Sequence, residues 1–126
     1  MRILKPFVIL IFFNVLILSC KNRCSEQNDN ARSQPRDTSL IGLWRFINEK
    51  DTEYLDLRKN GDYYDPINPK PSGVWYTSGK NIIMTYCNGD VPITGWEKPG
   101  KDTEPYIVGI DTVFINKSPY IRIKRY

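Results

Sequence analysis

The alternation of apolar and polar residues changes twice along the chain. Residues 7–18 form one apolar run that only Asn14 interrupts. Residues 21–39 contain no large apolar side chain, and from Leu40 onward short apolar runs alternate with turn residues. A segment without large apolar side chains cannot offset the entropy lost on ordering, so we expect it to be a flexible, disordered linker. The chain therefore divides into three parts: a leader (1–19), a linker (20–39) and a folded domain (40–126).

The folded domain carries the pattern of an all-β protein. Its apolar stretches are short and rich in Ile, Val, Tyr and Trp, and it contains no helical period of useful length. Short strands at regular spacing indicate a sandwich or a barrel, and a closed barrel is favoured because closure leaves no exposed strand edge. We expect eight strands in an antiparallel barrel, at 40–48, 53–58, 62–65, 73–77, 81–86, 106–110, 113–116 and 120–124.

The turn at Asn60-Gly61 leaves the register of the first hairpin open between two possibilities. A two-residue turn would pair Leu57 with Tyr64, whereas a three-residue loop with Gly61 as a bulge would pair Leu57 with Tyr63. A shift of the register by one residue would change which of these two tyrosines is buried. We favour the bulged loop.

A long segment rich in glycine and proline, 87–104, separates two of the expected strands. We expect it to lack regular structure, because glycine and proline interrupt helices and strands. It carries Trp96, and loops contribute binding residues more often than their scaffolds do. Two roles stay open for Trp96: contact with a partner protein, or packing over one end of the barrel.

The leader has the features of an export signal. Positively charged Arg2 and Lys5 precede the apolar run, which is shorter than the roughly 20 residues of a membrane-spanning helix. The stretch LILSC at 16–20 resembles the lipobox of bacterial lipoproteins. The resemblance implies that Cys20 receives a diacylglycerol and becomes the acylated first residue, which would anchor the protein on a membrane. Lys21, which follows the cysteine, resembles the residue found in lipoproteins that are sorted to an outer membrane. The alternative to a lipoprotein leader is a plain secretory signal.

Two further cysteines, Cys24 and Cys87, would lie in a compartment where disulfides form. A bridge between them would pin the linker to the rim of the barrel. The sequence does not decide between this bridge and two unbridged thiols, because the distance between the residues depends on the fold.

Three short motifs in the folded domain, GLW at 42–44, KNGDY at 59–63 and GVW at 73–75, resemble the small lipocalin-like domains of bacterial lipoproteins. The resemblance implies an eight-stranded up-and-down barrel that holds a small hydrophobic molecule. It also implies a tryptophan on the first strand that closes the barrel floor under a basic side chain from the last strand. Trp44 matches the tryptophan, and Arg122 is the candidate for the basic residue.

The interior of so short a barrel has two possible states, filled or hollow. An eight-stranded barrel is just wide enough to be filled by its own side chains or to hold one small ligand. A few aromatic side chains are large enough to fill it. The candidates for the core or for ligand contact are Trp44, Phe46, Trp75, Met84, Tyr106 and Phe114.

The composition argues against catalysis and against nucleic-acid binding. The chain has no histidine, which removes the commonest general base and metal ligand, and it shows no nucleophile elbow, phosphate loop or zinc spacing. Its 18 basic and 14 acidic residues are interspersed rather than gathered on one basic face. Asp56, Asp62 and Asp65 are expected to form a solvated hairpin edge and not a calcium site. We expect no cofactor and no metal.

These features predict a non-enzymatic, membrane-anchored, lipocalin-like lipoprotein of the bacterial cell envelope, most simply on the outer membrane. Its expected partners are the membrane, through acyl chains on Cys20, and a small hydrophobic ligand in the barrel. One alternative is a protein-binding module, such as an inhibitor of an envelope hydrolase, that acts through the 87–104 segment. Another alternative is a purely structural component of the envelope.

Overall fold

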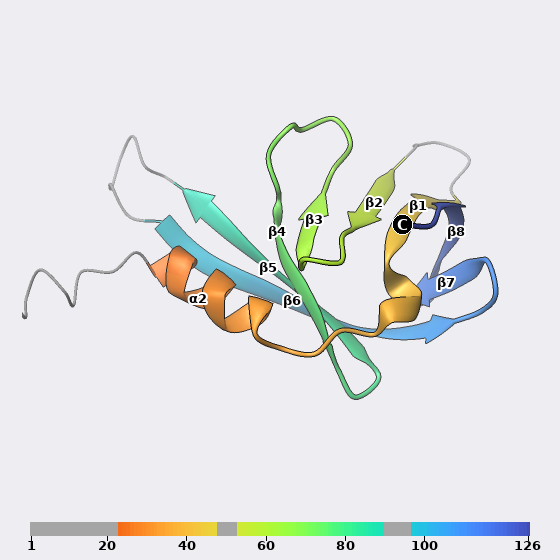
Figure 1. Cartoon of the computed structure of the whole chain (residues 1–126), viewed down its shortest axis with the longest axis horizontal. Coiled ribbons are helices and arrows are strands. Elements are labelled where there is room, and N and C mark those ends of the chain that lie inside the picture. Colours follow the sequence, from red (N-terminus) through yellow and green to blue (C-terminus); the bar gives the residue numbers. More distant parts are fainter. Residues whose placement is uncertain (1–22, 48–52, 90–96) are drawn as a thin grey trace, which may run out of the picture.

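A closed barrel of eight antiparallel strands forms the centre of the molecule (Figure 1). The computed structural model describes residues 23–47, 53–89 and 97–126. Each strand pairs with its neighbours along the chain, and β8 closes the barrel against β1, which confirms the expected up-and-down order. The strands are β1 Gly42–Phe46, β2 Tyr54–Leu57, β3 Asp62–Tyr64, β4 Gly73–Ser78, β5 Asn81–Gly89, β6 Glu97–Val108, β7 Thr112–Ile115 and β8 Ser118–Lys124.

The hairpin between β2 and β3 has the bulged register. Leu57 pairs with Tyr63, as favoured from the sequence, and Gly61 has a φ of 95° that only glycine adopts without strain. The guanidinium of Arg36 occupies the space where a Cβ on Gly61 would lie. Two features therefore favour glycine at position 61: the backbone conformation of the turn and the Arg36 side chain packed against it.

A cluster of fully buried side chains fills one half of the barrel. Trp44 and Trp75 are completely buried, and the indole N–H of each reaches a backbone carbonyl, at Leu40 and Arg58 respectively. These hydrogen bonds let large aromatic side chains enter the core without an unpaired donor. The buried cluster is completed by Leu40, Leu57, Ile82, Val113 and Ile115.

The prediction that Phe114 fills the barrel is wrong. Side chains alternate between the two faces of a strand, and β7 turns Val113 and Ile115 inward, so that Phe114 faces outward and is 44% exposed. The other expected core aromatics remain on or near the core. Phe46 is half-buried with its ring 5.2 Å from that of Tyr120, and Tyr106 is half-buried against the core cluster.

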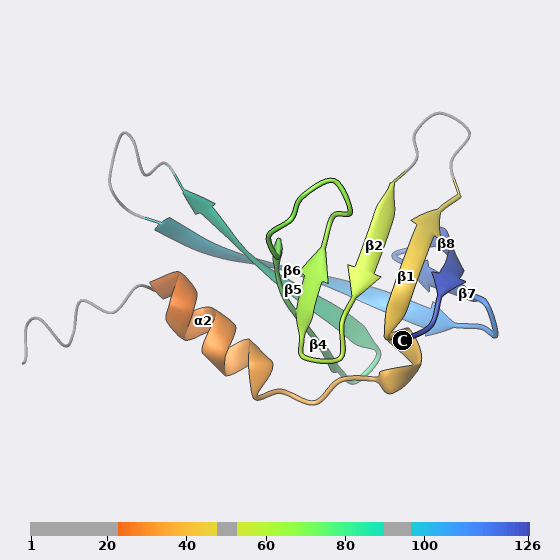
Figure 2. The same ribbon diagram turned by 45° about the horizontal axis from the view of Figure 1, so that its top comes forward.

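Helix α2, Arg23–Arg32, lies against the outer face of β4, β5 and β6 (Figures 1 and 2). This part of the expected linker is therefore ordered, which corrects the expectation of a flexible segment there. The helix buries only small side chains, Cys24 and Ala31, so it can lie close to the sheet. No helix within the described ranges has the length and apolar character needed to cross a membrane.

The expectation of an irregular 87–104 segment is also wrong for the residues that the structure describes. β5 extends to Gly89 and β6 begins at Glu97, and the two strands form a long ribbon that projects from the barrel (Figure 2). Pro99 is accepted because β6 pairs there with β5 alone, and a free edge tolerates a residue without an N–H. Gly100 is needed because the ring of Tyr86 lies where its Cβ would be.

Candidate functional site

One end of the barrel is closed around Trp44. The short helix η1, Thr38–Leu40, crosses this end, and Arg122 from β8 lies 4.1 Å from the centre of the Trp44 ring. The Arg122 guanidinium donates to the carbonyls of Ile41 at 2.8 Å and Ser39 at 2.6 Å. The predicted role of Arg122 as the basic group over the tryptophan is confirmed.

Gly42 explains why a glycine precedes Trp44 in the motif at this end. Its φ is 152°, and a Cβ there would overlap the backbone carbonyl of Lys124 and approach the Arg122 guanidinium. A side chain at this position would push β8 away from β1. The first glycine of the motif therefore allows the close approach that places Arg122 over the indole.

A second set of hydrogen bonds seals the same end. The Tyr106 hydroxyl donates to Asp37 at 2.9 Å, and the Asp37 backbone N–H donates to the Thr77 hydroxyl. Burial and the hydrogen bond to Asp37 raise the pKa of Tyr106 to about 12. The side chains that seal this end are paired with one another. A hollow of about 330 Å³ lies at this end as well, and its lining includes Ser39, Ile41 and Arg122.

The opposite end, here called the mouth, contains a cup of about 250 Å³. Five partly or wholly buried side chains from five different strands or their ends reach into it, and they rest on the buried core cluster. They are Leu55, Tyr63, Met84, Ile115 and Tyr120. The barrel is thus filled in one half and hollow in the other, which resolves the two possibilities left open by the sequence.

The rim of the cup is acidic. Its lining includes the exposed residues Glu53, Asp65 and Asp102, and among the described residues it includes no lysine or arginine. Asp102 is the cross-strand partner of Met84, and paired residues of neighbouring strands project from the same face, so both face the cup. Within the described ranges, neither Glu53 nor Asp102 forms an ion pair. Asp65 accepts a hydrogen bond from the backbone N–H of Ile67 at 3.2 Å.

The rim carboxylates act on the tyrosines below them. Burial, followed by the nearby charge of Asp102, raises the pKa of Tyr63 to about 12, and the Tyr63 hydroxyl donates to the Thr85 carbonyl at 2.8 Å. Burial and the charge of Glu53 also raise the pKa of Tyr120. Both phenols therefore stay neutral at physiological pH, and the cup combines neutral aromatic rings with negative charge at its entrance.

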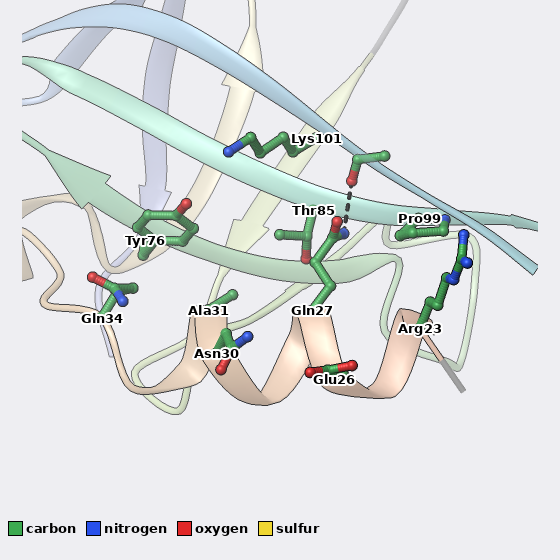
Figure 3. Close-up of a pocket in the computed structure, with 11 residues that line it drawn as sticks. Arg23, Glu26, Gln27, Asn30, Ala31, Gln34, Tyr76, Thr85, Pro99 and Lys101 are labelled. Carbon is green, nitrogen blue, oxygen red and sulfur yellow. Dashed lines mark hydrogen bonds between the residues drawn. The ribbon is translucent and has the colours of Figure 1, made fainter. Parts of the chain in front are cut away.

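A second hollow, about 530 Å³, lies between α2 and the outer face of the sheet (Figure 3). The helix side contributes the amide side chains of Gln27 and Asn30, and the sheet side contributes Tyr76 and Lys101. The Gln27 amide donates to the Gly100 carbonyl at 2.8 Å, which ties the helix to β6 across this hollow. Its lining, like that of the cup, combines polar and apolar surface.

A disulfide joins Cys24 of α2 to Cys87 of β5, with their Cα atoms 5.9 Å apart. The bridge that the sequence left open is therefore formed in the structure. Together with the Gln27 hydrogen bond, it fastens the helix to the projecting ribbon rather than to the barrel rim.

Two of the three acidic residues of the β2–β3 hairpin, Asp56 and Asp62, are not part of a solvated edge, contrary to expectation, whereas Asp65 is exposed as expected. Asp56 accepts two hydrogen bonds from Arg58, at 2.9 and 2.8 Å, and one from the Tyr126 hydroxyl. Asp62 forms an ion pair with Arg32 of α2. Asp56 and Asp62 are both buried, and their charges are therefore compensated within the protein.

The structure places some of the predicted site residues differently from the expectation. Cys20 and Trp96 lie outside the described residues, so lipidation and the loop role stay predictions. Trp44 and Trp75 are core residues, and Phe114 is on the surface. The sequence did not single out the cup residues Glu53, Tyr63, Asp102 and Tyr120. Alternation along each strand determines which side chains face the barrel interior, but these positions can be assigned only when the register is known.

Comparison with known proteins supplies no further identification. The chain matches no protein-family model, no curated protein and no solved structure. The barrel topology is compatible with a lipocalin-like domain, and that likeness rests on the order of the strands and on the arrangement of Trp44 and Arg122.

Proposed function

We propose that this protein is a non-enzymatic, lipid-anchored envelope protein whose lipocalin-like barrel binds a small ligand in the cup at its mouth. The observation that carries the proposal is the division of the barrel into a filled half and a hollow half. Small-molecule sites are typically concave and apolar with a few polar groups at fixed places. The cup is concave, its lining combines apolar side chains with tyrosines and carboxylates, and it lies at the mouth, where barrels commonly bind ligands.

Binding is a better account of the cup than catalysis. The titratable groups that face it are carboxylates and two tyrosines, and the pKa values of both tyrosines are raised away from neutrality. General acid–base catalysis works best with a group whose pKa lies near the working pH. The chain also has no histidine to supply one.

The anchoring part of the proposal rests on the leader. The apolar run, the LILSC stretch and Cys20 together favour a protein that is exported and held on the outer membrane by acyl chains. Mass spectrometry of the mature protein from bacterial envelopes tests this directly. An N-terminal cysteine carrying acyl chains is the expected result, and an unmodified Cys20 would refute the anchor.

Ligand binding can be tested with a reporter inside the cup. The chain has two methionines, Met1 and Met84, and only Met84 remains once the leader is removed. We expect the Met84 methyl NMR signal of ¹³C-methyl-methionine-labelled protein in lipid nanodiscs to shift saturably when a small apolar probe such as 2-naphthol is added.

A variant pair separates cup binding from binding elsewhere. Leu55→Trp fills the cup and should abolish the shift, whereas Ile107→Trp adds the same side chain at a position that is 72% exposed and should leave the shift unchanged. Near-ultraviolet circular dichroism checks that both variants fold. A Met84 signal that does not move with any probe, or that still moves in Leu55→Trp, would contradict the proposal.

The projecting ribbon supports a second candidate function, a protein-binding module such as an inhibitor of an envelope hydrolase. Beyond Met84, β5 pairs only with β6, and the connection between the two strands carries Trp96. Tryptophan is enriched among residues that dominate binding energy. A photo-crosslinking residue in place of Trp96 should capture one hydrolase in intact envelopes, and untagged protein with Trp96→Ala should fail to compete. Absence of any specific adduct would remove this candidate.

A further inference from the structure

The charge at the mouth differs in sign from the charge of the whole chain. The chain has a formal net charge of +4, yet the described part of the cup lining carries three carboxylates and no basic residue. Lys70 and Lys117 lie in turns of the chain and are not part of this lining. The negative mouth is therefore a local feature and does not reflect an acidic protein.

Two of these carboxylates have no positive partner in the parts of the chain that the structure describes. Glu53 and Asp102 form no ion pair, whereas the buried carboxylates Asp56 and Asp62 are each matched by an arginine. Glu53 and Asp102 lie close enough to the cup tyrosines to raise their pKa values, so both charges act on the interior. A neutral ligand that covered them would remove water from these charges without compensation.

The walls of the cup suit a positive charge. The faces of aromatic rings carry a negative quadrupole that attracts cations, and Tyr63 and Tyr120 line the cup from two sides of the barrel. Met84 adds a polarisable sulfur to the wall, and Leu55 and Ile115 add apolar surface. A bound ligand would thus meet aromatic and aliphatic walls inside and carboxylates at the entrance.

We propose that the cup selects a small organic cation, namely an amine or quaternary ammonium with apolar substituents. The inference rests on the proposed function, because it names the class of ligand for the same cup. A metal ion is a poorer match, because no group of three or more acidic or cysteine side chains in the described ranges is placed to hold one. An anion is disfavoured because the lining residues that the structure describes offer it no positive group.

A pair of isosteric probes tests the role of charge. Choline and 3,3-dimethylbutan-1-ol have the same shape, and they differ in whether the central atom is a charged nitrogen or a neutral carbon. We expect the Met84 methyl signal of the full mature protein in nanodiscs to report binding of choline about tenfold tighter than of the neutral alcohol. The preference should decrease as the salt concentration rises, because ions screen exposed charges.

Matched variants locate the source of the preference. Glu53→Gln and Asp102→Asn should each reduce the preference for choline severalfold while the affinity for the neutral alcohol stays the same. Glu26→Gln and Asp29→Asn make the same chemical changes on exposed residues of α2, and they should leave the preference intact. The neutral alcohol also serves as an internal check that each variant keeps its cup.

The outcomes separate this inference from the proposal on which it rests. Tighter binding of choline that depends on Glu53 and Asp102 supports the inference. Equal binding of the two probes, or tighter binding of the alcohol, overturns the inference and leaves the cup as a ligand site. Failure of choline, the alcohol and 2-naphthol to move the Met84 signal overturns the proposed function as well.

Discussion

At the closed end of the barrel, charged and polar side chains pair with partners within the protein, whereas at the mouth two carboxylates face solvent. Arg122 lies over Trp44 and donates to two carbonyls, and Tyr106 donates to Asp37. Glu53 and Asp102 have no such partner among the described residues. The same strands run through both ends, and the two ends differ in how far their charged side chains are paired within the protein.

The largest expected effect follows from removing the floor of the barrel. Trp44→Ala deletes a fully buried indole and leaves a cavity, so we expect it to lower the free energy of unfolding by about 3–5 kcal/mol. Urea denaturation followed by circular dichroism measures this loss. Ile110→Ala, at a residue that is 85% exposed, is the control and should be nearly neutral. A loss below about 1 kcal/mol for Trp44→Ala would mean that the closed end does not hold the barrel together.

A smaller loss is expected when the basic group over the floor is removed. Arg122→Met keeps an apolar stem but loses the interaction with the indole and two hydrogen bonds to carbonyls, which should cost about 2 kcal/mol. Arg122→Lys should recover only part of this, because a lysine cannot present two forked donors. Equal stabilities of the lysine variant and the parent protein would show that charge alone matters at this position.

At the boundary between core and cup, Tyr63→Phe should cost about 1 kcal/mol at pH 8 by removing the hydrogen bond to Thr85. It should also change the response to alkaline pH. The pKa of Tyr63 is raised to about 12 in the folded state, above its ordinary value of 10.0, so the neutral form is favoured by folding. This contribution is complete below about pH 10 and is lost as the pH rises toward 12.

Urea denaturation at pH 8 and pH 11 tests the alkaline prediction. The parent protein should lose stability between these values, and Tyr63→Phe should lose less. Tyr63→Phe should still lose some stability between pH 8 and pH 11, because the pKa values of Tyr106, Tyr120 and Tyr126 are also raised. Identical losses in the two proteins would show that Tyr63 is not the group responsible.

The smallest effect on stability is expected at the rim. Glu53→Gln and Asp102→Asn remove exposed charges that have no ion-pair partner in the described residues, so each should change the free energy of unfolding by less than about 0.5 kcal/mol. The same denaturation assay measures this change. A loss of 2 kcal/mol in either variant would assign that carboxylate to the scaffold and weaken the contrast between the two ends.

Much of the barrel was predictable from the sequence, because short apolar strands alternate with turn residues throughout 40–126. The register of Leu57 with Tyr63 followed from the bulge at Gly61, and the pairing of Trp44 with Arg122 followed from the short motifs. Phe114 was misplaced because a run of apolar residues in β7 does not show by itself which parity faces inward.

Helix α2 and the ribbon were missed for a different reason. The helix has only Cys24 and Ala31 as buried side chains, so its sequence lacks an amphipathic pattern, and contacts with the sheet stabilise it. The ribbon passes through Pro99 and Gly100, which local propensity excludes, yet a free edge and the packed Tyr86 ring accept them. Tertiary contacts therefore determine the secondary structure of both segments.

If Cys20 is acylated as proposed, the disulfide would shorten the connection between the barrel and the membrane. Cys24 follows Cys20 by four residues, and four residues of fully extended chain reach about 14 Å. Because Cys24 is covalently bound to Cys87, acyl chains on Cys20 would hold the ribbon within that distance of the membrane. The domain would then sit against the lipid headgroups with α2 and the ribbon nearest to them, and it would not swing freely at the end of a long tether.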